Sequence, residues 1–311
     1  MRAALQSDLD NVAVIQRLRE AIGAALRGKD DVVELALVAV VAGGHLLLED
    51  VPGVGKTTLA SSLAAALGGS FRRVQLTSDL LPADVTGSPV IDRASGELVF
   101  RPGPVFANVV LADELNRTSP KTQSALFEAM EEGAVTVDGQ THALPRPFFV
   151  IATQNPFDTA GTFALPDSQL DRFSMRLSIG YPSRDAERAV LRGNRLERGS
   201  IEPVLTPREA VALQQAAEQV GVANEVEDYL LDLVELTRTD PRLLRGVSTR
   251  GAVALFRAVR AAALVDGRSF AVPEDVRRLA PVVLGHRIVA RSGDGEAAIR
   301  GLLDALPSPV G

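Results

Sequence analysis

The sequence predicts an α/β protein in which a parallel sheet is followed by an all-helical domain. Three observations lead to this fold class. An apolar run at 45–48, a glycine-containing loop and a helical segment at 57–67 follow one another as at the start of a parallel α/β unit. Two further apolar runs, 109–112 and 148–152, are typical of strands buried on both faces. Beyond residue 183 the pattern is helical.

The elements before the sheet and between its strands follow from local patterns. Two helices are expected over 10–42, where apolar residues recur at helical spacing and then form an apolar-rich segment. Two β-hairpins are expected to interrupt the α/β pattern. The first joins 90–91 to 98–100 through a polar turn, and the second is centred on Asp138-Gly139, a strong signal for a two-residue turn.

A domain boundary is expected at 181–183, where Tyr-Pro-Ser precedes the helical region. We therefore expect one domain over residues 1–182, made of the α/β core with its N-terminal helices, and a helical domain over residues 183–311. The helices of the second domain are expected at 185–198, 207–220, 224–237, 250–264 and 273–284.

Composition and charge exclude several classes of protein. The 311 residues include no cysteine, so disulfides and thiolate metal sites are excluded. No apolar run approaches the roughly 20 residues of a membrane-spanning helix, and residues 1–10 lack the apolar core of a signal peptide, so a cytoplasmic location is expected. Residues 1–180 carry 15 basic and 21 acidic side chains, whereas residues 181–311 carry 18 of each. A general electrostatic hold on nucleic acid is therefore not expected.

A candidate phosphate-binding loop follows the first apolar run. It has the sequence Pro52-Gly53-Val54-Gly55-Lys56-Thr57-Thr58, which fits the core of the Walker A pattern. Backbone N–H groups in such a loop point at phosphate oxygens, and the following helix adds the positive end of its dipole. Lys56 would reach the β- and γ-phosphates of ATP, and the Thr57 hydroxyl would bind Mg²⁺. Asp50 stands where the pattern has its first glycine, so its carboxylate should point away from the phosphates while its backbone tolerates left-handed geometry.

Two acidic residues, Asp113 and Glu114, follow the apolar run at 109–112. A buried strand would leave both carboxylates at the C-terminal edge of the sheet, where ligands bind. Asp113 would hold Mg²⁺ through water, since Mg²⁺ keeps much of its hydration. Glu114 would polarise the attacking water as a general base or positioning group. A merely solvated strand end has the same pattern, and the phosphate loop earlier in the chain is what favours the catalytic interpretation.

Together with the segments around these motifs, the chain resembles the MoxR family of AAA+ ATPases over nearly its whole length. The matching segments are LEDVPGVGKTTLA (48–60), RVQLTSDLLPADVTG (73–87), FRPGPVFANVVLADELNRTSPKTQSALFEAMEE (100–132), FFVIATQNP (148–156), LPDSQLDRF (165–173), GVSTRGAVALFRAVRA (246–261) and PEDVRRLAPVVLGHRI (273–288). The resemblance implies a P-loop αβα core with a parallel sheet, followed by an all-α lid. It also implies that the two hairpins are insertions, one within the second core helix and one before the sensor 1 residue.

The resemblance assigns roles that the pattern alone does not reveal. Asn155 matches sensor 1, a polar group that orients the attacking water. Arg172 matches the arginine finger, which reaches into the neighbouring subunit's site, and Arg250 matches sensor 2, which contacts phosphate from the lid of its own subunit. Gly28 and Lys29 correspond to the segment that lines the adenine pocket, mostly through its backbone. In isolation, Asn155 would be interpreted as an Asn-Pro turn, Arg172 as a surface arginine and Arg250 as a helix-start arginine.

The sequence leaves the roles of other polar residues near these motifs undecided. Asn116, Arg117 and Lys121 either lie near a subunit interface or belong to a solvated helix start. His286 is expected to be a packed lid residue, and no metal site is expected among the three histidines.

The function that the resemblance implies is a ring-forming ATPase, expected to be hexameric, that remodels, matures or activates a partner protein. That partner is often a von Willebrand factor A-domain protein. A nucleic-acid motor is an alternative, but the charge of the core and the weakly basic hairpins count against it. A chelatase-type subunit is a second alternative with a related core. A nucleotide-gated binding module without turnover would have no need of Glu114.

Overall fold

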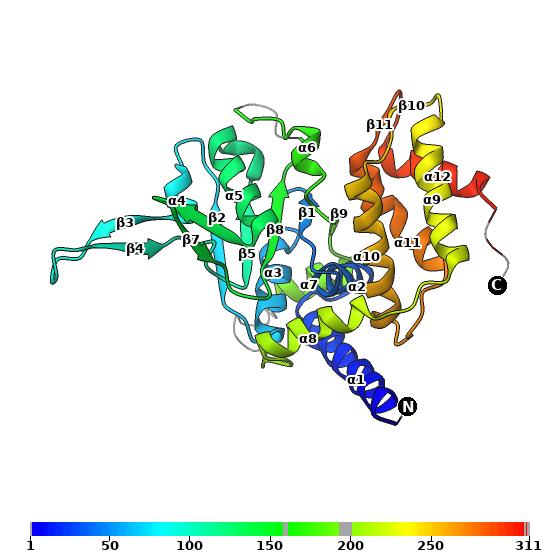
Figure 1. The fold of residues 1–311 in the computed structure, drawn as a ribbon, viewed down its shortest axis with the longest axis horizontal. Helices are drawn as coiled ribbons and strands as arrows, with labels where there is room; N and C mark the ends of the chain where they lie inside the picture. Colours follow the sequence, from blue (N-terminus) through cyan, green and yellow to red (C-terminus); the bar gives the residue numbers. More distant parts are fainter. Residues whose placement is uncertain (1, 158–160, 193–200, 308, 310–311) are drawn as a thin grey trace.

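The computed structural model describes residues 2–157, 161–192, 201–307 and 309, and Figure 1 shows their arrangement. The helices are α1 (Arg2–Ala25), α2 (Asp30–Val41), α3 (Lys56–Ala66), α4 (Pro82–Thr86), α5 (Pro120–Glu132), α6 (Asp167–Leu170), α7 (Arg184–Leu191), α8 (Pro207–Glu218), α9 (Asn224–Thr239), α10 (Thr249–Val265), α11 (Pro273–Leu284) and α12 (Gly295–Ala305). The strands are β1 (Leu46–Glu49), β2 (Phe71–Gln75), β3 (Gly87–Ile91), β4 (Leu98–Pro102), β5 (Val109–Asp113), β6 (Ala134–Val137), β7 (Gln140–Ala143), β8 (Phe149–Gln154), β9 (Met175–Leu177), β10 (Leu243–Arg245) and β11 (Val289–Ala290). Two 3₁₀ turns, η1 (Leu115–Arg117) and η2 (Gly285–Arg287), complete the set.

The central sheet has five parallel strands in the order β2-β5-β8-β1-β9. The three apolar runs predicted to be strands form its three inner members, so the predicted parallel α/β core is confirmed. The outer strands were not predicted. In β2 only Val74 is buried while Arg72 and Arg73 face solvent, and β9 is three residues long, so neither presents an apolar run.

Helices cover both faces of the sheet because successive side chains of a strand point to opposite faces. In β1, Leu46 and Leu48 pack in the cluster that contains α1, α2 and α3, whereas Leu47 packs in the cluster that contains α5. Each of these leucines is fully buried, which is worth roughly 1.5–3 kcal/mol per side chain. The result is a three-layered αβα core, as predicted.

The helical part of the chain, α8 to α12, lies beside this core (Figure 1). Its buried residues join the cluster on the α1–α3 face of the sheet, so one apolar core runs from the sheet through α2 to α10. The four helices α8 to α11 begin and end within three residues of the predicted ranges. The predicted helix over 185–198 is observed as α7, and the part of it from residue 193 lies outside the described residues.

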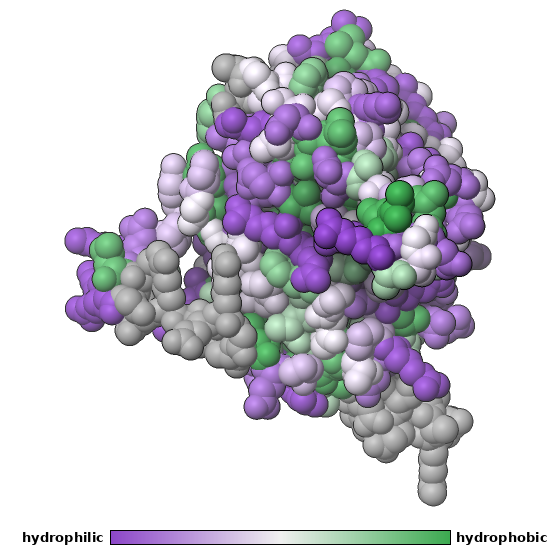
Figure 2. All heavy atoms as spheres, turned by 90° about the vertical axis from the view of Figure 1, so that its left-hand side faces the viewer, coloured by the Kyte–Doolittle hydropathy of each residue, from purple (hydrophilic) through white to green (hydrophobic). Residues whose placement is uncertain are grey.

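The two predicted hairpins are confirmed as β3–β4 and β6–β7. Asp138 and Gly139 both have positive φ, at 49° and 76°, as a type I′ turn requires. The longer hairpin β3–β4 projects from the body (Figure 1), and Figure 2 views the molecule from that side, where apolar patches are small and scattered. The ring of Phe100 stacks on that of His142 with centroids 3.9 Å apart, which ties the two hairpins together.

Among the described residues, no helix is long and apolar enough to cross a membrane.

Candidate functional site

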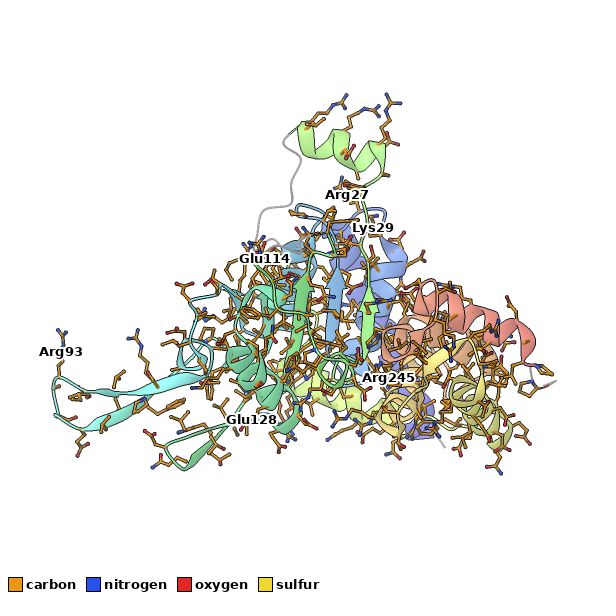
Figure 3. All side chains as sticks on the ribbon, turned by 90° about the horizontal axis from the view of Figure 1, so that it is seen from above. Arg27, Lys29, Arg93, Glu114, Glu128 and Arg245 are labelled. Atoms are coloured by element: carbon orange, nitrogen blue, oxygen red, sulfur yellow. The ribbon has the colours of Figure 1, made fainter. Side chains whose placement is uncertain are left out.

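A pocket of about 560 Å³ lies at the C-terminal ends of β1, β5 and β8. This is the edge at which parallel α/β sheets bind their ligands. The predicted site residues that line it are Lys29, Pro52, Gly53, Val54, Gly55, Lys56, Thr57, Thr58, Asp113, Glu114 and Asn155. In Figure 3 Arg27 and Lys29 lie side by side and Glu114 lies further to the left on the same, upper side of the view, whereas Glu128 and Arg245 lie in its lower part.

The loop between β1 and α3 forms one wall of the pocket. Gly53 and Gly55 have φ of 88° and 111°, a region that residues with a Cβ rarely adopt. A Cβ on Gly55 would also lie 2.9 Å from Leu26 Cδ1, so the loop passes close to the end of α1. Helix α3 begins at Lys56, directly after Gly55, so its first N–H groups and its dipole are available to an anion in the pocket.

The Lys56 side chain folds back onto the start of the phosphate loop. Its Nζ donates to the carbonyl oxygens of Asp50 at 2.9 Å and Val51 at 3.1 Å. Burial lowers the pKa of Lys56, and the carboxylates of Asp113, Asp50 and Glu114 oppose that shift. An ammonium group has three donors, so one of them remains for a ligand oxygen after these two bonds.

Asp50 is buried, and its carboxylate points away from the loop, as expected from the sequence. It accepts hydrogen bonds from Ser178 Oγ at 3.0 Å, from Gly180 N at 3.1 Å and from Ile179 N. Its backbone is not among those with positive φ, so left-handed geometry at this position is not required. The carboxylate instead ties the start of the loop to the chain that follows β9.

Asp113 is buried at the end of β5. Its Oδ1 accepts a hydrogen bond from Thr153 Oγ1 at 2.6 Å, and its Oδ2 accepts from Arg73 Nη2 at 2.5 Å and Nε at 3.1 Å. Strands β2 and β8 flank β5 and bring these two partners to the carboxylate from either side.

Glu114 has a left-handed backbone with φ of 58°, which is uncommon for a residue with a side chain. Its N–H donates to Thr153 Oγ1 at 3.0 Å, and this bond helps to hold the unusual conformation. Its Oε2 accepts from Gln75 Nε2 at 2.6 Å and lies 3.2 Å from Arg117 Nε. A strained residue in a pocket is a frequent feature of catalytic sites.

Asn155 directly follows β8 and lines the pocket. Its Oδ1 accepts from Phe157 N at 3.2 Å, so the Asn-Pro turn and the pocket position occur together. On the opposite wall Lys29 lines the pocket and donates through Nζ to Tyr181 O at 2.7 Å. Gly28 precedes it with φ of 72°, in the tight turn between α1 and α2.

Arg172 and Arg250 lie elsewhere, in a second pocket of about 280 Å³. Both form ion pairs with Glu131 at the end of α5, at 2.8 Å for Arg172 and 2.6 Å for Arg250. Arg250, expected to reach the phosphate pocket of its own chain, lines the smaller pocket in this structure. The first turn of α10, which carries Arg250, contacts the end of α5 rather than the phosphate loop, and within the described ranges neither arginine lines the larger pocket.

Among the pocket-lining residues that carried no predicted role, Arg73, Gln75 and Thr153 are the ones that contact Asp113 or Glu114. Arg73 and Gln75 are two residues apart on a strand with no apolar run, and Thr153 is one polar residue near the end of a buried strand. Their proximity to Asp113 and Glu114 depends on the strand order, and the sequence does not specify that order.

The donors at the pocket fit a magnesium–nucleotide ligand. Backbone N–H groups and Lys56 suit phosphate, and the Thr57 hydroxyl and Asp113 carboxylate are oxygen donors of the kind Mg²⁺ prefers. Among the described residues, no group of three or more His, Cys, Asp or Glu side chains could hold a metal without such a ligand. The arrangement can therefore bind a triphosphate with the help of a cation and hold an acid, Glu114, beside it.

Known proteins resemble the chain in both sequence and fold. Residues 45–175 match the family described as ATPase family associated with various cellular activities (AAA), and residues 235–301 match an AAA lid domain. The Bacillus subtilis protein YeaC is 44% identical over 99% of this chain and 98% of its own. Chaperone MoxR1 of Mycobacterium tuberculosis is 38% identical over 84% of this chain and 72% of its own. The crystal structure of a proposed ATPase from Cytophaga hutchinsonii matches with a TM-score of 0.92 and 31% identity over 99% of both chains.

Proposed function

The chain belongs to the MoxR family of AAA+ ATPases, and we propose that it forms a ring in which ATP hydrolysis drives the remodelling of a partner protein. The observation that carries the proposal is the division of the catalytic groups between two pockets. Lys56, Asp113, Glu114 and Asn155 share the larger pocket, whereas Arg172 lies in the smaller one with Arg250. A chain divided in this way needs a neighbour to complete its site.

Nucleotide binding falls to the loop and the first turn of α3. Residues 52–58 cradle the phosphates with backbone N–H groups, and Lys56 adds a charge-assisted contact. Thr57 and Asp113 hold Mg²⁺, which when bound neutralises charge that develops on the phosphates. Lys29 lines the pocket on its adenine side, and Gly28 forms the turn that precedes it, close to the proposed boundary between the core (1–182) and the lid (183–311).

Glu114 and Asn155 act on the water. The carboxylate of Glu114 accepts a proton from the attacking water or orients it, and the Asn155 amide fixes its position. In the free chain Gln75 and Arg117 hold the Glu114 carboxylate, so these contacts keep the base in place until substrate arrives.

Arg172 acts on the nucleotide of the neighbouring subunit. In the free chain it is 2.8 Å from Glu131 and stacks over Phe127, and its Nε is buried without a hydrogen-bond partner among the described residues. A phosphate of the neighbour's nucleotide can replace Glu131 as the anionic partner of this guanidinium. Arg250 shares Glu131 with Arg172, and its action as sensor 2 on the phosphates of its own subunit requires its side chain to leave Glu131.

A ring follows because each subunit contributes its larger pocket to one interface and its Arg172 to the next. Head-to-tail contacts generate a ring when the rotation between subunits closes, and a hexamer is the closed form we propose. The relative named chaperone MoxR1 supports a chaperone-like activity for this chain. A von Willebrand factor A-domain protein is the partner class we propose, and the projecting β3–β4 hairpin offers an exposed element for contact with it.

Trapping the ATP-bound state tests this function. Glu114→Gln should bind ATP without hydrolysing it, so a ring of this variant should retain its partner during affinity capture with ATP present. Capture with ADP, and capture by Lys56→Ala with ATP, are the controls. A von Willebrand factor A-domain protein retained only by Glu114→Gln with ATP supports the proposal, and equal recovery under all conditions contradicts nucleotide-driven remodelling.

A further inference from the structure

One lid side chain makes an unusually dense set of contacts with the segment that carries Arg172. Arg287, in η2, has a side chain that is only 2% exposed. Its Nε donates to Asp171 Oδ1 at 2.7 Å, and its Nη2 donates to the carbonyl oxygens of Asp171 at 3.1 Å and Phe173 at 2.6 Å. Its Nη1 donates to Ser174 O at 3.1 Å. Arg287 thus binds the main chain on both sides of Arg172.

The absence of a side chain at Gly251 leaves space for the Arg287 side chain. A Cβ on Gly251, in the first turn of α10, would lie 2.9 Å from Arg287 Cδ. The carboxylate of Asp171 also accepts from Ser248 Oγ at 2.8 Å, and Ser248 is the N-cap of α10. Asp171 therefore joins η2, the start of α10 and the Arg172 segment at one point.

The cost of burying this guanidinium indicates that the contact does more than fill space. Burial lowers the pKa of Arg287, and the hydrogen bond and charge of Asp171 oppose that shift, so Asp171 offsets part of the cost of burying the guanidinium. The planar guanidinium donates in several fixed directions at once, which suits the carboxylate and carbonyls of a single chain segment. Loss of the side chain would free that segment and leave a carboxylate with one partner fewer.

We infer that Arg287 is a positioning residue for Arg172: it fixes, from the lid, the segment that presents Arg172 to the nucleotide of the neighbouring subunit. The inference rests on the proposed action of Arg172 across the subunit interface. Arg287 does not line the larger pocket, so its effect on hydrolysis reaches only the neighbour's site. The position of the lid and the activity of the next subunit are coupled through this residue.

The first test measures turnover of Arg287→Met in assembled rings. A small misplacement of a reacting group can cost about 10²-fold in rate, so kcat should fall by about that factor while ATP affinity by calorimetry is unchanged. The double variant Arg172→Ala/Arg287→Met should turn over no more slowly than Arg172→Ala alone, because the two residues act as one unit. A further, multiplicative loss in the double variant would overturn the inference.

The second test mixes inactive chains and measures ATPase activity after subunit exchange. Arg287→Met mixed with Glu114→Gln should regain activity, since some sites then combine an intact Glu114 with an intact neighbour. Arg287→Met mixed with Arg172→Ala should regain none. Rescue by Arg172→Ala instead, or by neither partner, would mean that Arg287 serves its own site or only the fold.

Arg268→Met is the matched control within the lid. Arg268 pairs with Asp275 at 2.7 Å and Asp266 at 2.9 Å, and within the described part of the chain it has no hydrogen bond or ion pair with the Arg172 segment. The Arg268→Met variant should have a lower midpoint of thermal unfolding, and its ATP turnover should stay near that of the wild type. If Arg287→Met does not fold, Arg287→Lys serves in the same mixtures, because a lysine keeps the charge but lacks the planar fork. Wild-type turnover in Arg287→Lys would overturn the inference.

The reference mixture is Arg172→Ala with Glu114→Gln. Rescue there, without the predicted pattern for Arg287, rejects this inference alone. No rescue there rejects the action of Arg172 across the interface, and this inference with it.

Discussion

Replacing Asp50 with alanine should destabilise the fold. It should remove no direct contact with ATP. Asp50 occupies the position of the first glycine in the Walker A pattern, but its carboxylate faces the chain after β9 rather than the phosphates. The substitution therefore removes an internal brace and leaves the phosphate-binding N–H groups in place.

The magnitude follows from the three donors that lose their acceptor. Ile179 is buried, and an unpaired buried N–H costs about 1–3 kcal/mol. Gly180 N is half-buried and Ser178 is exposed, so water can satisfy both in part, and together they should add about 1 kcal/mol. The free energy of unfolding should fall by about 2–4 kcal/mol.

The assay is urea unfolding followed by circular dichroism, with Ser178→Ala as the matched control. That control removes only the hydroxyl partner and should cost about 1 kcal/mol or less. Asp50→Gly, which restores the usual motif residue, should be as unstable as Asp50→Ala. Wild-type stability in Asp50→Ala, or a gain of stability in Asp50→Gly, would refute the reasoning.

Three further predictions concern single groups. Lys56→Ala should lose ATP binding in calorimetry, because a charge-assisted contact to phosphate is removed, and unchanged affinity would contradict the loop assignment. Glu114→Gln should bind ATP but hydrolyse it poorly, since the amide cannot accept a proton, and normal phosphate release would place the base elsewhere. Burial lowers the pKa of His45 to about 4, against 6.5 for a free imidazole. The contribution of the neutral ring to the free energy of unfolding is therefore complete above pH 6.5 and is lost as the pH falls toward 4. This loss should reach about 3 kcal/mol in the wild type and be absent in His45→Gln. If urea unfolding shows the same acid sensitivity in both proteins, the prediction for His45 is contradicted.

The sequence predicted the inner strands and the loop because their signals are local. The apolar run ending at Leu111 and Ala112 and the glycines at 53 and 55 each determine a short segment without reference to the rest of the chain. The hairpin turn at Asp138-Gly139 is a signal of the same kind. Pocket residues carried by these segments were therefore found.

Contacts that depend on distant packing were missed. Arg73 reaches Asp113 only because β2 pairs with β5, and the pairing of an edge strand rich in arginine has no apolar signature. The ion pair of Arg250 with Glu131 likewise depends on how α10 packs on α2 and α11, which brings its first turn to the end of α5. Arg287 donates four hydrogen bonds to residues more than a hundred positions away, and no local pattern predicts them.

The measurement that tests the shared active site most directly is the ATPase activity of mixed rings of Arg172→Ala and Glu114→Gln chains. Each variant alone should be nearly inactive, since loss of an arginine finger costs on the order of 10³-fold in turnover. In rings exchanged at random, about a quarter of interfaces join an intact Glu114 to an intact neighbouring Arg172. Activity should then rise well above either parent, up to about a quarter of the wild-type rate. If activity stays at the parental level while native mass spectrometry demonstrates exchange, Arg172 does not act on the neighbouring subunit.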